Sequence, residues 1–82
     1  MTFQDVLNAV TAELSDYAAA KKLGISRHSF SQYRNGKNIP REEILDKMAE
    51  MSGLDPTHVY LAAYAEKLHN PMVAERFRTL AA

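Results

Sequence analysis

The stretch that decides the fold is residues 16 to 40, "DYAAAKKLGISRHSFSQYRNGKNIP". Its first part predicts a helix over 17–23. Ser15 or Asp16 is a suitable N-cap, because a short side-chain oxygen can accept hydrogen bonds from the free amides of the first turn. Gly24 is expected to end this helix, since glycine adopts a positive φ without steric cost. A second helix is expected to begin only three residues later.

That second helix is predicted over 27–34, with Ser26 as its N-cap and the following "NG" as its stop signal. At about 100° per residue, Phe30 and Tyr33 lie within about 60° of each other and predict an inward face. The opposite arc holds side chains that donate or accept hydrogen bonds: Arg27, His28, Ser31, Gln32 and Asn35. The helix is therefore predicted to have one buried face and one exposed polar face.

Two helices joined by a tight turn that contains glycine have the layout of a helix-turn-helix. The small side chain of Ala20 permits a close crossing, while Leu23 and Ile25 are expected to fill the space between the helices. The major groove of DNA is about 12 Å wide and admits a helix, and its base edges present donors and acceptors. By that chemistry Arg27 matches guanine and Gln32 matches adenine.

The rest of the chain predicts further short helices and no strand. Near the start, apolar residues recur on one helical face at Phe3, Val6, Leu7, Val10 and Leu14. Helices are also expected over 41–51, from 55 or 56 to about 69, and over 72–80, because Pro71 must end or kink the helix before it. The expected inward residues of these helices include Ile44, Leu45, Met48, Met51, Val73, Phe77 and Leu80. Short helices with short connections predict an all-α, compact domain of five or six helices.

Charge is distributed unevenly along the chain, although its formal total is zero. Residues 1–15 carry −2 and residues 42–82 carry −3, whereas residues 16–41 hold six cations against Asp16 alone and reach +5. A basic segment between two acidic ones indicates an anionic partner for that segment. The alternative is a solvated helix face that binds nothing.

The chain resembles the phage repressor and Cro-type helix-turn-helix proteins, also called the XRE-like family. The resemblance covers roughly residues 3–55 and rests on "YAAAKKLGIS", "YRNGKNIP", a fourth amphipathic helix and "GLDP". It implies a lambda-repressor-like fold with a DNA-binding domain over 1–55, in which residues 16–36 form the helix-turn-helix. A C-terminal helical extension over 56–82 is then expected to pack on this domain or to dimerise.

The resemblance also implies which residues contact double-stranded DNA. Base contacts are implied from Arg27, His28 and Gln32, with Ser31 as a further candidate. Backbone contacts are implied at Tyr17, Lys21, Asn35, Gly36 and Lys37, and Arg34, beside the reading arc, is expected to contact a phosphate. Helix N-termini and glycine-containing loops present N–H groups to phosphate, which agrees with these positions. Asp16, in contrast, would repel a phosphate unless its side chain folds back as a cap.

Other chemistries find little support in the residues. The chain has no cysteine, and His28, His58 and His69 share no metal-ligand spacing, so neither a metal nor another cofactor is expected. No serine stands in a recognisable nucleophile motif, and we expect no enzymatic activity. No segment approaches the roughly 20 apolar residues that cross a bilayer, which makes a cytoplasmic location the expectation.

The last third of the chain allows two interpretations. Leu61, Ala65, Leu68 and Met72 follow one helical stripe, and Tyr60 and Tyr64 form a neighbouring one. This wide apolar face closes the core, or it forms the dimer that a helix-turn-helix protein needs to read two half-sites about 34 to 36 Å apart.

The function expected from the sequence is a sequence-specific DNA-binding transcriptional regulator of the phage or bacterial repressor type. It would act as a homodimer on an inverted-repeat operator and read the major groove with helix 27–34. Two alternatives stay open. One is an antitoxin with an autoregulatory helix-turn-helix, and the other is a protein-interaction module that binds no DNA.

Overall fold

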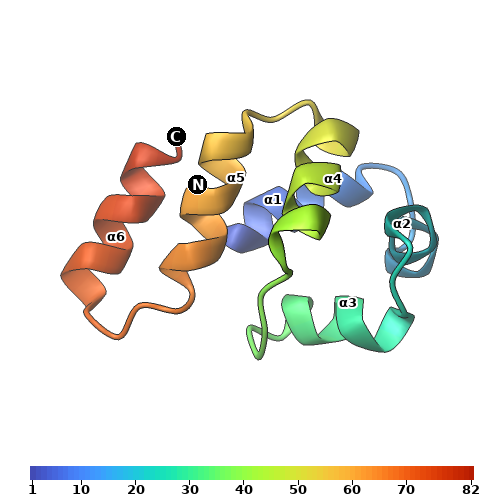
Figure 1. Ribbon diagram of the computed structural model, residues 1–82, viewed down its shortest axis with the longest axis horizontal. Helices are drawn as coiled ribbons and strands as arrows, with labels where there is room; N and C mark the ends of the chain where they lie inside the picture. Colours follow the sequence, from blue (N-terminus) through green and yellow to red (C-terminus); the bar gives the residue numbers. More distant parts are fainter.

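The computed structural model describes residues 1–82 and consists of α-helices without a strand. The helices follow one another through short connections (Figure 1). In chain order they are α1 (Phe3–Thr11), α2 (Asp16–Leu23), α3 (Arg27–Arg34), α4 (Glu42–Ser52), α5 (Pro56–Ala65) and α6 (Pro71–Leu80). The predicted all-α class is confirmed, and the chain is compact, with a Cα radius of gyration of 11.8 Å.

Thr2 and Asp5 start α1 through reciprocal hydrogen bonds. The Thr2 hydroxyl accepts from the Asp5 N–H (3.1 Å), and the Asp5 carboxylate accepts from the Thr2 N–H (2.9 Å). These bonds hold the pKa of the Asp5 carboxyl below its usual value. The helix ends at Thr11. The prediction that Leu14 lies on its inward face is therefore wrong, because Leu14 is outside the helix. The chain leaves the helix at Ala12, whose φ of 47° lies in the left-handed region.

The core lies where α1, α4 and α5 meet, while α2 packs against α1 and α4, and α3 packs against α2. Its largest fully buried side chains are Phe3, Phe30, Leu7, Leu23, Leu45, Met48, Val6 and Val59. Burying each such side chain is worth about 1.5 to 3 kcal/mol. Five helices therefore share one hydrophobic core, to which α3 contributes Phe30.

The inward face of α4 differs from the prediction at one position. Ile44, Leu45 and Met48 are buried as expected, but Met51 is only half-buried. Ala49 is 3% exposed and takes the inward place instead, since it follows Leu45 by four residues, about one helical turn. The helix itself lies one residue later than the predicted range.

The helix predicted to run to about residue 69 ends at Ala65. Glu66 and Lys67 instead donate their amide N–H groups to carbonyls three residues back, which tightens the chain into turns. Asn70 is then the N-cap of α6, and Pro71 is the first residue of that helix. Pro71 requires the residue before it to leave helical geometry, and Asn70 accordingly has an extended backbone.

The expected boundary at residue 55 does not divide the core, because Val59, Ala62 and Ala63 of α5 belong to the same buried cluster as α1 and α4. The last helix, α6, packs on α5 at the end of the molecule opposite α2 (Figure 1), and Ala81, just past its end, joins the same buried cluster. No helix has the length and apolar character that crossing a membrane requires.

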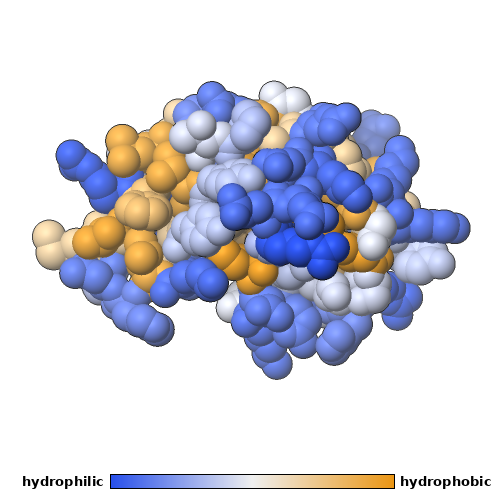
Figure 2. Space-filling view, viewed as in Figure 1, coloured by the Kyte–Doolittle hydropathy of each residue, from blue (hydrophilic) through white to orange (hydrophobic).

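The apolar face predicted for the last helix is largely exposed. Of the three predicted residues, Leu80 is 56% exposed, Val73 is 41% exposed and Phe77 is half-buried. Met72, at the start of the helix, is 82% exposed, and the buried residues of this segment are Ala74 and Ala81. Figure 2 accordingly shows hydrophobic atoms at the α6 end of the molecule.

Candidate functional site

Local hydrogen bonds build the predicted turn between α2 and α3. Gly24 has a φ of 75°, and its N–H donates to the Lys21 carbonyl (3.1 Å). The Ile25 N–H donates to the Ala20 carbonyl (3.0 Å), so carbonyls at the end of α2 are satisfied within the turn. Ser26 then caps α3 as predicted by accepting from the N–H of the third helical residue. The turn between the two helices is thus completed within three residues.

The end of α3 uses the same geometry. Gly36 has a φ of 70°, its N–H donates to the Tyr33 carbonyl (3.2 Å), and the Lys37 N–H donates to the Gln32 carbonyl (3.0 Å). These two amides are therefore unavailable to an external anion, which corrects the expectation that Gly36 offers its N–H to phosphate. The next two amides, of Asn38 and Ile39, have no hydrogen-bond partner in the chain.

The faces of α3 are those predicted from its periodicity. Phe30 is 0% exposed and Tyr33 9%, and both belong to the core. Burial raises the pKa of the Tyr33 hydroxyl, an effect that the nearby Arg41 opposes.

On the opposite face, the predicted base-reading side chains lie together. Arg27, His28 and Ser31 are exposed, and Gln32 is half-buried. The Gln32 Nε2 and His28 Nε2 atoms are 3.3 Å apart, and Ser31 Oγ accepts from Asn35 at 3.4 Å. The helix contains no acidic residue. Side chains in this arrangement can donate hydrogen bonds to one partner surface and accept hydrogen bonds from the same surface.

Arg34 does not lie on this exposed face. Its guanidinium donates to both carboxylate oxygens of Asp16 (3.0 and 3.2 Å), to Asn8 Oδ1 (2.7 Å) and to Thr11 Oγ1 (3.4 Å). It also lies 5.6 Å from the centre of the Phe30 ring. Four of its five N–H donors are thus engaged inside the chain. We therefore remove Arg34 from the candidate phosphate contacts and assign it to holding α3 against α1 and α2.

This pairing also changes the expected role of Asp16. Its carboxylate does not fold back as a cap, because Ser15 caps α2 by accepting from the Ala18 N–H at 3.1 Å. The carboxylate is instead matched by Arg34, an ion pair whose side chains are 49% and 24% exposed. The negative charge at the start of α2 is therefore offset within the chain.

Gln4 is a structural contact that the sequence did not indicate. From α1 its side-chain amide donates to the carbonyls of Tyr33 (3.3 Å) and Arg34 (3.1 Å) at the end of α3. The Tyr33 carbonyl also accepts from the Gly36 N–H, but the Arg34 carbonyl has no other partner in the chain, so Gln4 satisfies a group that would otherwise need water. No local pattern marks this role, because the partners are about thirty residues away.

The remaining backbone candidates are exposed. Tyr17 is 57% exposed in the first turn of α2, and Lys21 lies one turn later on the same helix. Asn35 and Lys37 are exposed at the end of α3. No group of three His, Asp or Glu side chains is placed to hold a metal ion.

Comparison with known proteins adds no relative. No protein-family model, no curated protein and no solved structure matches this chain.

Proposed function

We propose that this chain is a sequence-specific DNA-binding regulator, with α2, the turn 24–26 and α3 as a lambda-repressor-like helix-turn-helix. The observation that carries the proposal is the two-sided α3. Phe30 and Tyr33 anchor it in the core, while Arg27, His28, Ser31 and Gln32 lie opposite on an exposed face without a carboxylate. A rigidly held helix with such a face has the dimensions and donor pattern that the major groove accepts.

Electrostatics support this assignment. The segment 16–41 is strongly basic, and its one carboxylate, Asp16, is paired with Arg34 rather than left to face an anion. Lys21 of α2 and Lys37, just past the end of α3, are exposed, where they can neutralise phosphates. The resemblance to phage repressor and Cro-type proteins implies base contacts from the same exposed face of α3 and backbone contacts from Lys21 and Lys37.

A repressor of this type reads an inverted repeat as a homodimer. The exposed Met72, Val73 and Leu80 of α6 supply apolar surface for such an association. The same surface favours a second candidate function, an antitoxin whose helix-turn-helix autoregulates while α6 binds a toxin. If α6 forms the homodimer, Leu80→Glu should dissociate it in sedimentation of the purified chain, whereas a chain that keeps α6 for a toxin should remain a dimer after this substitution.

The deciding experiment is selection of bound duplexes from a random pool with purified protein. We expect enrichment of an inverted repeat. In matched measurements on the selected site, Arg27→Ala or Gln32→Ala should each cost about 1 to 3 kcal/mol and relax the preference at one base position. Lys47→Ala, an exposed substitution on α4, serves as the control and should leave that preference intact. Recovery of no motif at moderate salt would contradict the proposal and favour a protein-interaction module.

A further inference from the structure

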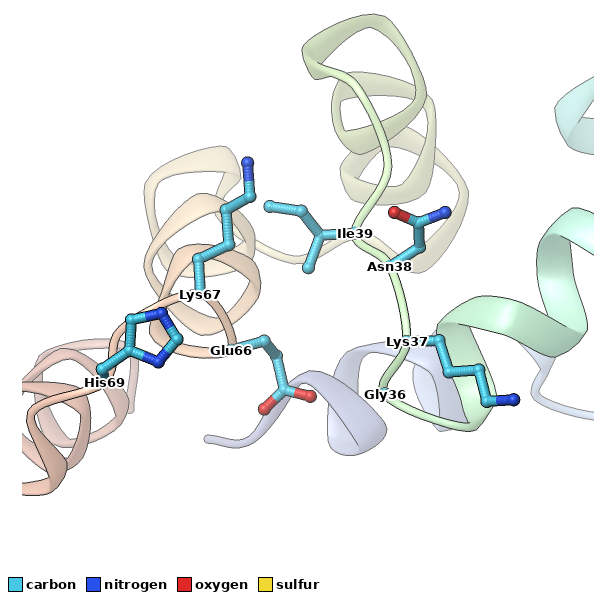
Figure 3. Close-up of a pocket in the computed structure, with 7 residues that line it drawn as sticks. All are labelled: Gly36, Lys37, Asn38, Ile39, Glu66, Lys67 and His69. Carbon is cyan, nitrogen blue, oxygen red and sulfur yellow. The ribbon is translucent and has the colours of Figure 1, made fainter.

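The loop after α3 and the connector between α5 and α6 come together around an open pocket. Residues 36–39 line one side and Glu66, Lys67 and His69 line the other, enclosing about 240 Å³. Figure 3 shows the His69 ring turned toward the loop and the Glu66 carboxylate reaching toward Gly36. About thirty residues of chain separate the two sides, so the pocket exists only in the folded protein.

The chemistry of this pocket suits an anion better than an apolar ligand. Ile39 is its one hydrophobic lining residue. Lys37 and Lys67 carry positive charge on long, flexible side chains, which Figure 3 shows extended away from the centre of the pocket, and the His69 imidazole can donate an N–H. The amides of Asn38 and Ile39, which have no partner in the chain, add donors beside them.

The pocket continues the edge of the molecule on which α3 lies. The loop leaves the end of α3 directly, and Figure 1 shows α3, this loop and the connector along the same lower edge. A duplex lying along α3 therefore has one backbone strand beside the loop, and the connector is the next part of the chain that this strand meets.

We propose that the connector, through Lys67 and His69, extends the DNA-backbone interface beyond Lys37, with a backbone phosphate seated between loop and connector. This inference rests on the function proposed above. It assigns a second set of phosphate contacts to residues 66–69. This segment lies outside the helix-turn-helix and outside the basic segment 16–41. The class of ligand is a phosphodiester of double-stranded DNA.

Glu66 opposes this contact. Its Oε1 lies 3.7 Å from the position that a methyl group on Gly36 would take, so the carboxylate sits at the loop itself. A carboxylate in a phosphate footprint lowers affinity through like-charge repulsion, and this repulsion weakens with salt. Removal of its charge should therefore strengthen binding, an effect that damage to the fold cannot imitate.

The test is fluorescence anisotropy with the selected duplex and with a random duplex over a series of salt concentrations. We expect Lys67→Ala to reduce the slope of log K against log salt by about 0.9, which amounts to about eightfold weaker binding at 0.1 M salt. The loss should be equal for both duplexes. His69→Ala should weaken both equally but by a smaller factor, and Glu66→Gln should bind several-fold more tightly.

Lys47→Ala is the matched control, since it removes one exposed lysine charge from α4, at a separate hollow lined by Lys22, Glu50 and Met51. The Lys47 Nζ lies 3.9 Å from the position that a methyl group on Gly24 would take, away from the connector, so this variant should change the slope by less than Lys67→Ala does. If Arg27→Ala impairs binding while the Lys67, His69 and Glu66 variants match the wild type, the connector inference is overturned and the proposed function stands. If the wild-type chain binds neither duplex, both are overturned together.

Discussion

Replacing Arg34 with alanine should destabilise the whole domain, because this side chain joins three helices. The change removes a bidentate ion pair with Asp16 (3.0 and 3.2 Å), a hydrogen bond to Asn8 (2.7 Å) and a contact with the Phe30 ring. We expect the free energy of unfolding to fall by about 2 kcal/mol.

That magnitude follows from the exposure of the partners. Asp16 is 49% exposed, so the screened ion pair contributes only about 0.5 to 1 kcal/mol. The hydrogen bond to Asn8 adds about 1 kcal/mol and the position over the Phe30 ring about 0.5 kcal/mol. In a domain of this size such a loss lowers the melting temperature by about 8 to 16 °C.

Urea unfolding followed by circular dichroism measures the effect, and Arg41→Ala is the control. The Arg41–Glu43 pair is 3.9 Å apart, with side chains 72% and 80% exposed, so its loss should change stability by less than about 0.5 kcal/mol. Equal stabilities of the Arg34→Ala and Arg41→Ala variants would refute the assignment of Arg34 to holding α3 in place.

A double-mutant cycle with Asp16→Asn isolates the ion pair. The coupling energy between the two positions should be about 0.5 to 1 kcal/mol. A coupling near zero, together with a reduced salt slope for DNA binding by Arg34→Ala, would instead restore Arg34 to the phosphate contacts.

Two further predictions concern single residues. Ala12→Gly should raise the free energy of unfolding by about 1 kcal/mol, because relief of the strain at φ 47° and ψ −109° exceeds the added backbone entropy of glycine; a lower melting temperature would contradict this. The hydrogen bond from the Tyr60 hydroxyl to the Asp46 carboxylate (2.6 Å) raises the pKa of Tyr60 to about 12. Its contribution to stability is therefore complete below pH 10 and is lost as the pH rises toward 12. An ultraviolet titration of tyrosinate should show this late ionisation, and Tyr60→Phe should remove it.

The helices near the proposed reading face were predictable because their signals are local. Ser26 caps α3 with its own hydroxyl, Gly24 and Gly36 take the left-handed geometry that ends each helix, and the spacing of Phe30 and Tyr33 sets the inward face. Each of these effects acts within one or two helical turns. They can be read before any tertiary contact is known.

The errors occurred where local signals were weak or ambiguous. Leu14 continues the apolar spacing of α1, but the helix has already ended at Thr11. The chain leaves it at Ala12, a residue whose identity does not indicate a positive φ. The apolar spacing of α6 predicts burial, but that helix packs mainly on α5 and leaves Met72 and Leu80 exposed. Periodicity shows that a face is apolar without showing whether anything covers it.

The sequence by itself determined that the chain forms short helices, the caps of α2 and α3, the three-residue turn and the polar arc of α3, since periodicity and capping depend only on near neighbours. Only the tertiary structure decided that Arg34 turns inward to Asp16, that Gln4 caps α3, and that residues 66–69 meet the loop 36–39. These partners are 18 to 30 residues apart in the chain, and a charged side chain that pairs across helices has the same local sequence pattern as one left in solvent.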